Sequence, residues 1–153
     1  MGIKIYLGFD HQSFHLKDKV LGYLVKKGYD VEDLSGDSLD LADDFPVFAQ
    51  AVSAKVLSSS SRDPRGVLIC GGGQGMAMAA NRFKGIRASV VWDSHEAKVT
   101  RHDNDSNVIS LPARVVSQCA DSEWQDILET WLTTKFADAS RFRRRNAEID
   151  ELV

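Results

Sequence analysis

The segment 67–81 constrains the fold of this chain more than any other part of the sequence. An apolar run, Val67–Ile69, predicts a buried strand, four glycines stand within positions 71–75, and good helix formers follow from Met76 to Asn81. Glycine lets the backbone turn sharply and approach a ligand closely. Because the first N–H groups of a helix lack intrahelical partners, they favour an anion at that point. The segment therefore predicts a strand–turn–helix unit whose turn faces a small anionic or carbonyl-bearing ligand.

Cys70 stands at the mouth of this turn. A thiol beside a helix N-terminus is favoured in its thiolate form, so Cys70 is a candidate base or nucleophile. The plainer interpretations are a buried, inert strand residue and a simple tight turn. The segment has neither Gly-x-Gly-x-x-Gly nor a Gly-Lys-Ser/Thr ending, so the sequence does not indicate dinucleotide or nucleoside triphosphate binding.

Strand and helix patterns alternate along the whole chain, which at 153 residues predicts a single domain over 1–153. Strands are expected at 3–9, 29–34, 67–69, 86–91 and 108–111, and helices at 13–27, 46–57, 76–81, 94–102 and 115–133. Such alternation with short loops predicts an α/β fold, in which helices cover both faces of a five-stranded parallel sheet. A further helical pattern over 138–152, basic at Arg141–Arg145, forms a C-terminal extension.

Ligands of such sheets gather beyond the carboxyl ends of the strands. This rule places Asp10-His11, the turn after Cys70, Asp93 and Leu111–Arg114 along one edge. Asp10 is either the N-cap of the following helix or a ligand for substrate hydroxyls, and His11 then assists phosphate binding.

Composition limits the possible partners. A formal net charge of −3 does not favour a nucleic-acid-binding role, and no apolar run approaches membrane-spanning length. The two cysteines do not form a disulfide framework, and no secretory signal pattern is present, so a cytoplasmic protein is expected. His11 and His15 have the spacing of a helical metal pair but no evident third ligand, so no metal site is expected.

Two polar segments remain. Residues 101–107 form a dense hydrogen-bonding run, which is either a capped helix exit or a recognition site for a polyol. The arginines of 141–145 are either a solvated helix face or, through Arg141 and Arg145 at i and i+4, a phosphate clamp. With the clamp, the site would hold a phosphorylated sugar.

In this order, these residues resemble the type B ribose-5-phosphate isomerases and the related galactose-6-phosphate isomerases. The likeness covers nearly the whole chain and is carried by Gly-Phe-Asp10-His11, Asp44-Phe45-Pro46, Cys70-Gly-x-Gly-x-Gly, Ala79-Ala80-Asn81, Gly85-Ile86-Arg87-Ala88, Asn104-Asp105-x-Asn107-Val108, Ala113-Arg114-Val115-Val116, Arg141 and Arg145. The resemblance implies a Rossmann-like three-layer αβα sandwich and catalysis without a metal or organic cofactor. It also implies a homodimer or dimer of dimers with active sites shared between subunits, the helix 138–152 packing on a partner subunit.

The resemblance also implies residue roles. Cys70 matches the base that moves a proton between C1 and C2 through an enediolate, whose charge is held by the loop Gly71, Gly72, Gly73, Gln74 and Gly75. The implied substrate ligands are Asp10, His11, Asp44 and Asn104, and the implied phosphate ligands are His11, Arg114, Arg141 and Arg145.

The chain departs from the family pattern at three places: Gly72 replaces Thr or Ser, Phe45 replaces a common Tyr, and Asp103 replaces the His that opens the sugar ring. His102 is displaced by one position, which on a helix turns a side chain by about 100°. A carboxylate is a poor acid at neutral pH. Ring opening is therefore the step for which the sequence departs from the family, and either Asp103 or His102 would support it.

The sequence therefore predicts an aldose–ketose isomerase of a small sugar phosphate, with ribose 5-phosphate and ribulose 5-phosphate as the leading pair. The same chemistry on a tetrose 4-phosphate or a hexose 6-phosphate is the alternative. A sugar-phosphate-binding protein without turnover is a third possibility.

Overall fold

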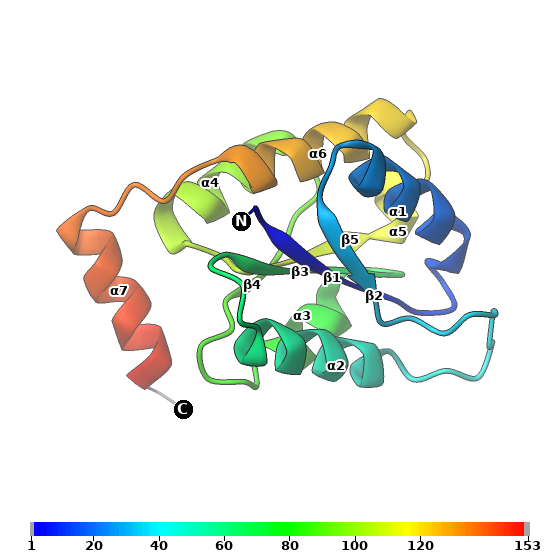
Figure 1. The fold of residues 1–153 in the computed structure, drawn as a ribbon, viewed down its shortest axis with the longest axis horizontal. Coiled ribbons are helices and arrows are strands. Elements are labelled where there is room, and N and C mark those ends of the chain that lie inside the picture. Colours follow the sequence, from blue (N-terminus) through cyan, green and yellow to red (C-terminus); the bar gives the residue numbers. More distant parts are fainter. Residues whose placement is uncertain (1, 152–153) are drawn as a thin grey trace.

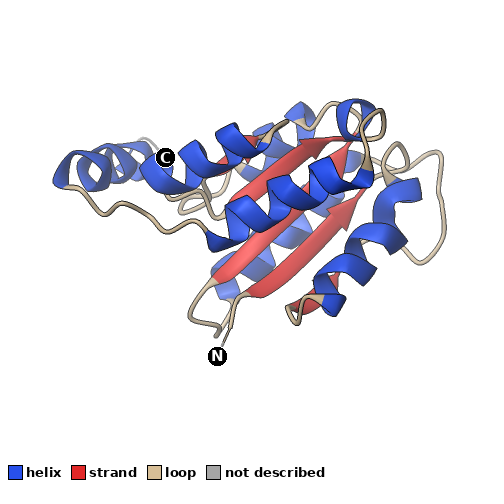
Figure 2. Cartoon of the chain, turned by 90° about the horizontal axis from the view of Figure 1, so that it is seen from above, coloured by secondary structure: helices blue, strands red, loops and turns tan. Residues whose placement is uncertain are grey.

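The computed structural model describes residues 2–151. Within this range one sheet of five parallel strands runs in the order β2-β1-β3-β5-β4. The strands are β1 (Lys4–Phe9), β2 (Asp30–Asp33), β3 (Pro64–Cys70), β4 (Ala88–Val90) and β5 (Val108–Pro112). The predicted five-stranded parallel sheet in a three-layer αβα sandwich is confirmed (Figures 1 and 2).

Helices cover both faces of the sheet. They are the 3-10 turn η1 (Phe14–Leu16), α1 (Lys17–Lys26), α2 (Phe45–Ser58), α3 (Gln74–Ala80), α4 (Ser94–Asn104), α5 (Ala113–Val116), α6 (Asp121–Thr133) and α7 (Ser140–Glu151). In Figure 1, α1, α4 and α6 lie on one face and α2 and α3 on the other. Two apolar clusters correspond to these two interfaces.

Strand β3 shows why both faces are buried. Val67 and Ile69 belong to the cluster beneath α1, α4 and α6, whereas Leu68 and Cys70 belong to the cluster beneath α2 and α3. Successive side chains of a strand point to opposite faces, so a continuous apolar run is what a central strand covered on both sides requires.

The prediction of one long helix over 115–133 was wrong. The structure divides it into α5 and α6, with Ser117–Ala120 between them, so Cys119 lies outside a helix. The apolar pattern continues across the break, but acidic residues favour a helix N-terminus, and Asp121 and Glu123 form the first turn of α6. Most other predicted boundaries agree within two or three residues, and Leu152 of the predicted last helix lies outside the described range.

Helix α7 stands away from the three layers, after an extended connection (Figures 1 and 2). The connection before α7 and the first turn of α7 meet the end of α4. The Ala137 amide donates to the His102 carbonyl at 3.0 Å, and the buried Phe142 ring meets the His102 ring edge-on, with centroids 6.0 Å apart. No helix within residues 2–151 has the length and apolar character needed to cross a membrane.

Candidate active site

The carboxyl ends of β1, β3 and β5 meet at one edge of the sheet, as predicted. Phe9 pairs with Ile69 and Cys70 with Pro112, and the Asp10 amide donates to the Ile69 carbonyl at 3.4 Å. The residues that follow these strands therefore lie together. Asp93, at the same edge, caps α4 by accepting from the Glu96 amide at 2.8 Å.

Cys70 is the last residue of β3 and is 5% exposed. The glycine turn follows directly, and Gly73 has the left-handed φ of +72° that a side chain disfavours. The Ala77 amide donates to the Gly73 carbonyl, which is the first hydrogen bond of α3. The amides of Gln74, Gly75 and Met76 come before this bond and therefore have no acceptor within the helix. The thiol thus lies between a buried strand and a set of backbone donors.

Side chains from other segments lie close against this turn. A Cβ at Gly71 would overlap the Gln12 amide oxygen, and one at Gly72 would lie 2.8 Å from Arg114 Nη2. The room left by the missing Thr or Ser at Gly72 is therefore taken by the Arg114 guanidinium. The prediction did not include Gln12, because the two segments meet only when the sheet forms.

Arg114 is held to the turn by its backbone, since its amide donates to the Gly71 carbonyl at 3.0 Å. A pocket of about 490 Å³ opens beside it. Its lining comes from the turn, the end of β4 and the start of α5: Gly71, Gly72, Gln74, Val90, Trp92, Pro112, Arg114 and Val115.

Asp10 closes a tight turn after β1. Its carboxylate accepts from the backbone amides of Gln12 at 3.0 Å and Ser13 at 3.1 Å, while Ser13 itself is the N-cap of η1. Asp10 is only 3% exposed, and this burial raises the pKa of its carboxyl. Asp10 is therefore a buried acceptor in a fixed orientation, not the helix cap of the plainer interpretation.

His11 is oriented by Asp43. Its Nδ1 lies 2.6 Å from Asp43 Oδ1, and its backbone amide donates to the same oxygen at 3.2 Å. The hydrogen bond to Asp43 raises the pKa of His11, which favours the cationic ring. Asp44, the acidic residue that the sequence predicts as a substrate ligand, is exposed and is the N-cap of α2. The prediction did not include Asp43.

The second set of predicted residues lies elsewhere. Helix α4 begins beyond the carboxyl end of β4 and returns to the opposite edge, so His102, Asp103 and Asn104 lie where the strands start. His102 Nδ1 and Asp103 Oδ1 are 2.6 Å apart, and about half of the His102 side chain is exposed. One chain therefore does not bring these residues together with Cys70.

The arginines of α7 fall into two kinds. Arg143 pairs with Asp138 at 3.1 Å and Arg144 with Glu148 at 3.6 Å. No carboxylate within residues 2–151 lies within ion-pair distance of Arg141 or Arg145, and Arg141 stacks on Phe142 at 4.4 Å. Among the four arginines of α7, the two matched to phosphate ligands are thus the two that form no ion pair with a described residue.

The two histidines at metal-pair spacing have separate partners: His15 Nε2 lies 2.9 Å from Ser117 Oγ, whereas His11 faces Asp43. Within the described range, no three His, Cys, Asp or Glu side chains are grouped as a metal site.

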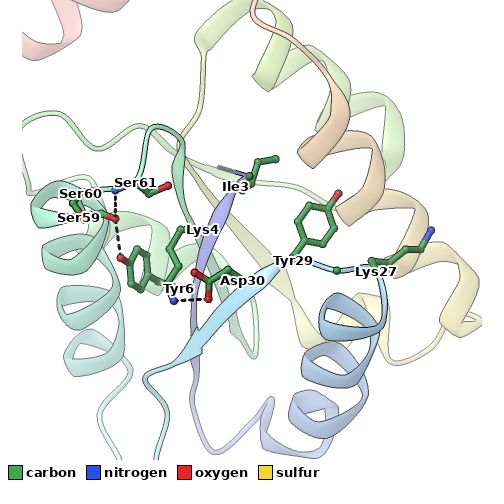
Figure 3. A pocket seen from close by; sticks show the side chains of 11 residues that line it. Ile3, Lys4, Tyr6, Lys27, Tyr29, Asp30, Ser59, Ser60 and Ser61 are labelled. Atoms are coloured by element: carbon green, nitrogen blue, oxygen red, sulfur yellow. Dashed lines mark hydrogen bonds and ion pairs between the residues drawn. The ribbon is translucent and has the colours of Figure 1, made fainter.

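A larger pocket, of about 690 Å³, opens at the edge where β1 and β2 begin (Figure 3). Its polar groups bind one another: Lys4 pairs with Asp30 at 2.8 Å, and the Tyr6 hydroxyl donates to Ser59 at 2.9 Å. These groups are already satisfied and carry no pattern of a reactive site, so size alone does not make this pocket the active site.

The family model described as Ribose/Galactose Isomerase matches residues 5–149. The chain belongs to this family. It is therefore an isomerase of the intramolecular oxidoreductase class, which interconverts an aldose and a ketose. The family recognised in the sequence is confirmed.

Individual relatives cover nearly all of the chain. Ribose-5-phosphate isomerase B of Escherichia coli is 35% identical over 143 residues, 93% of this chain and 91% of that protein. The 4-deoxy-4-sulfo-D-erythrose isomerase of Clostridium sp. strain MSTE9 is 34% identical over 136 residues, 89% of this chain and 82% of that protein. The solved structure of ribose-5-phosphate isomerase B from Mycoplasma genitalium with bound ribulose-5-phosphate has a TM-score of 0.90 at 34% identity, covering 99% of this chain and 97% of that one.

Proposed function

We propose that this isomerase interconverts ribose 5-phosphate and ribulose 5-phosphate, with Cys70 as the base and without a metal or organic cofactor. The relatives named for this activity support the substrate, and one of them holds ribulose-5-phosphate in the same fold. The observation that carries the mechanism is the junction of Cys70 with the glycine turn, beside Asp10, His11 and Arg114.

In this mechanism the Cys70 thiolate removes the proton from C2 of the open-chain aldose and returns it to C1. The electron pair left at C2 forms the C1–C2 double bond of the enediolate, and the charge at O1 is held by backbone amides of Gly71–Gly75. As C1 takes back the proton, a proton moves from the O2 hydroxyl to O1, which leaves the C2 carbonyl of the ketose. Asp10, Asp44 and Asn104 hold substrate hydroxyls. His11, Arg114, Arg141 and Arg145 hold the phosphate, and the cationic form favoured by Asp43 strengthens the contribution of His11.

The active site is completed by a second copy of the chain. The seven residues of β3 span roughly 20 Å, so Asp103, Asn104 and the α7 arginines of one chain lie too far from its own Cys70 to share a small sugar phosphate. In a symmetric dimer, α7 of each copy packs on the other and delivers these residues across the interface.

Exposed apolar side chains beside the candidate site support this assembly. Met78, Trp92 and Val115 are 67%, 53% and 44% exposed, and Trp92 and Val115 line the pocket beside Arg114. Covering them with a second copy would remove apolar surface from water. Dimers and dimers of dimers both meet this requirement.

The test is an isomerase assay over tetrose, pentose and hexose phosphates with Cys70→Ala and Cys119→Ala. Cys70→Ala is expected to lower kcat about 10²- to 10⁴-fold, the usual contribution of a general base, while calorimetry still detects ribulose 5-phosphate binding. Cys119→Ala is the matched control, because Cys119 lies between α5 and α6, and it is expected to match the wild type. Wild-type turnover by Cys70→Ala would refute the mechanism, and absence of turnover on every sugar phosphate would favour the binding-protein alternative.

A four-carbon substrate with a terminal anion is the second candidate. Asp103 stands where ring opening requires a His, and a relative at 34% identity is named for a sulfonated erythrose. A tetrose 4-phosphate cannot close a furanose, because the hydroxyl that would close the ring carries the phosphate. Such a substrate needs only the proton transfer at Cys70.

The comparison of kcat/KM for a tetrose and a pentose phosphate in the wild type and Asp103→His separates the two candidates. If ring opening is the slow step of the wild-type enzyme on a pentose phosphate, the wild type has the higher kcat/KM on the tetrose phosphate. Asp103→His then raises kcat/KM on the pentose phosphate. Efficient wild-type turnover of ribose 5-phosphate that His102→Ala abolishes would show that His102, hydrogen-bonded to Asp103, opens the ring instead.

A further inference from the structure

Arg87 lies where the end of α4, the start of β4 and the last turn of α7 meet. Its backbone is fixed first, since its amide donates to Asn107 Oδ1 at 2.8 Å and its carbonyl accepts from the Asn107 amide at 3.2 Å. The Asn107 side chain also donates to the Gly85 carbonyl at 2.8 Å. The segment before β4 and the segment before β5 are thus joined side by side.

The guanidinium of Arg87 holds the backbone that follows α4. Its Nε donates to the carbonyls of Asn104 at 3.1 Å and Asp105 at 3.2 Å, and its Nη2 donates to the carbonyl and carboxylate of Asp105 at 3.0 and 3.1 Å. Asp105 has a left-handed φ of +48°, a conformation that among residues with a side chain Asn and Asp adopt most readily. Arg87 therefore both satisfies carbonyls at the end of α4 and holds this turn residue in place.

The same arginine reaches α7. Its Nη1 lies 3.7 Å from Asp150 Oδ2, while Asp150 Oδ1 accepts from the Gly85 amide at 3.1 Å. Only 18% of the Arg87 side chain is exposed, so water weakens these interactions less than at the surface. Arg87 thus ties the orientation of α7 to that of the end of α4.

We propose that Arg87 is a positioning residue of the shared active site. It fixes Asn104 and α7, which carries Arg141 and Arg145, as one unit that each chain presents to the Cys70 of the other copy. This inference rests on the proposed function, since it assigns no contact between Arg87 and the substrate. The role follows from geometry: one partly buried guanidinium contacts both the Asn104 carbonyl at the end of α4 and Asp150 on the helix that carries the arginines.

The first test compares Arg87→Met and Arg87→Lys with Arg82→Met, which removes an exposed arginine from the same connection. Arg87→Met is expected to lower kcat/KM for ribose 5-phosphate about 10- to 100-fold through misplacement of the ligands, mainly as a higher KM. Arg87→Lys is expected to fall between Arg87→Met and the wild type, because an ammonium keeps the charge but loses the fork of donors. Arg82→Met is expected to match the wild type, and wild-type kinetics in Arg87→Met would overturn the proposal.

The second test uses mixed dimers, refolded from equal amounts of Cys70→Ala and Arg87→Met chains. In a mixed dimer one site combines the intact Cys70 of one chain with the intact Arg87 of the other, so about a quarter of wild-type activity is expected. Mixing Cys70→Ala with Arg141→Ala is the control for site sharing. If activity recovers in the mixture with Arg141→Ala but not in the mixture with Arg87→Met, the proposed role of Arg87 is overturned while the shared site stands. No recovery in either mixture would instead refute the shared site. If circular dichroism shows that Arg87→Met does not fold, Arg87→Lys takes its place in the mixture, and recovery is then measured as the activity above that contributed by the Arg87→Lys homodimers.

Discussion

Gly73→Ala gives a direct measure of how strictly the glycine turn is built. Gly73 has a φ of +72°, and an added Cβ would lie 3.1 Å from the Pro112 amide nitrogen and 3.2 Å from the Leu111 carbonyl carbon and Ser110 oxygen. All three are backbone atoms of β5 that cannot rotate away. Gly28 is the matched control, because its φ is +87° but nothing lies within 4 Å of its added Cβ.

The two variants separate conformational from steric cost. A left-handed residue with a side chain costs about 1–2 kcal/mol, so Gly28→Ala is expected to lower the free energy of unfolding by about that amount. Gly73→Ala adds the contact with β5, and such overpacking costs about 1–3 kcal/mol more. At about 2–4 °C per kcal/mol for a chain of this size, Gly73→Ala should lose several degrees of Tm beyond the loss in Gly28→Ala.

Urea unfolding and thermal melts measure the stabilities, and the isomerase assay at a temperature where both variants are folded measures activity. We expect Gly28→Ala to keep wild-type kcat and Gly73→Ala to lose most of it, because the amides that face the substrate move with the turn. Equal stability losses in the two variants would refute the steric argument. Wild-type kcat in a folded Gly73→Ala would refute the role of the turn as an oxyanion site.

Two further predictions concern the phosphate group of the substrate. Arg141→Ala or Arg145→Ala should each weaken sugar phosphate binding by about 1.5–3 kcal/mol through loss of a charged hydrogen bond, measured as KM or by calorimetry. Arg143, whose guanidinium pairs with Asp138, is the control, and Arg143→Ala should change binding little. Equal small effects of all three substitutions would favour a solvated helix face. Asp43→Asn should lower the pKa of His11 toward its ordinary value of 6.5, so that the rise of KM with pH begins at lower pH than in the wild type. A KM profile against pH that is the same in Asp43→Asn and the wild type would show that His11 does not act as a cation. The same pair also stabilises the fold: since Asp43 raises the pKa of His11, this stability is present below about pH 6.5 and is lost as the pH rises through the folded pKa.

Local sequence was sufficient for most of the fold. The run Val67–Ile69 is apolar at every position because β3 is covered on both faces. The glycines after it match a turn against which other segments lie closely. Such patterns are local, since burial period and turn conformation depend on neighbouring residues. The same logic failed at 115–133, where the apolar pattern of two helices continues through the polar break between them.

The sequence by itself also determined which residue types the proposed chemistry uses: a cysteine at the end of a strand, a glycine turn, and paired arginines near the C-terminus. Only the tertiary structure decided their partners. Asp43 and Asp44 are equivalent in local sequence, but only the path of the loop to α2 brings the first to His11. The length of α4 carries Asn104 to the edge opposite Cys70, because a helix between parallel strands must cross back over the sheet. That return path is a property of the whole sheet, and it separates the two groups of predicted site residues within one chain.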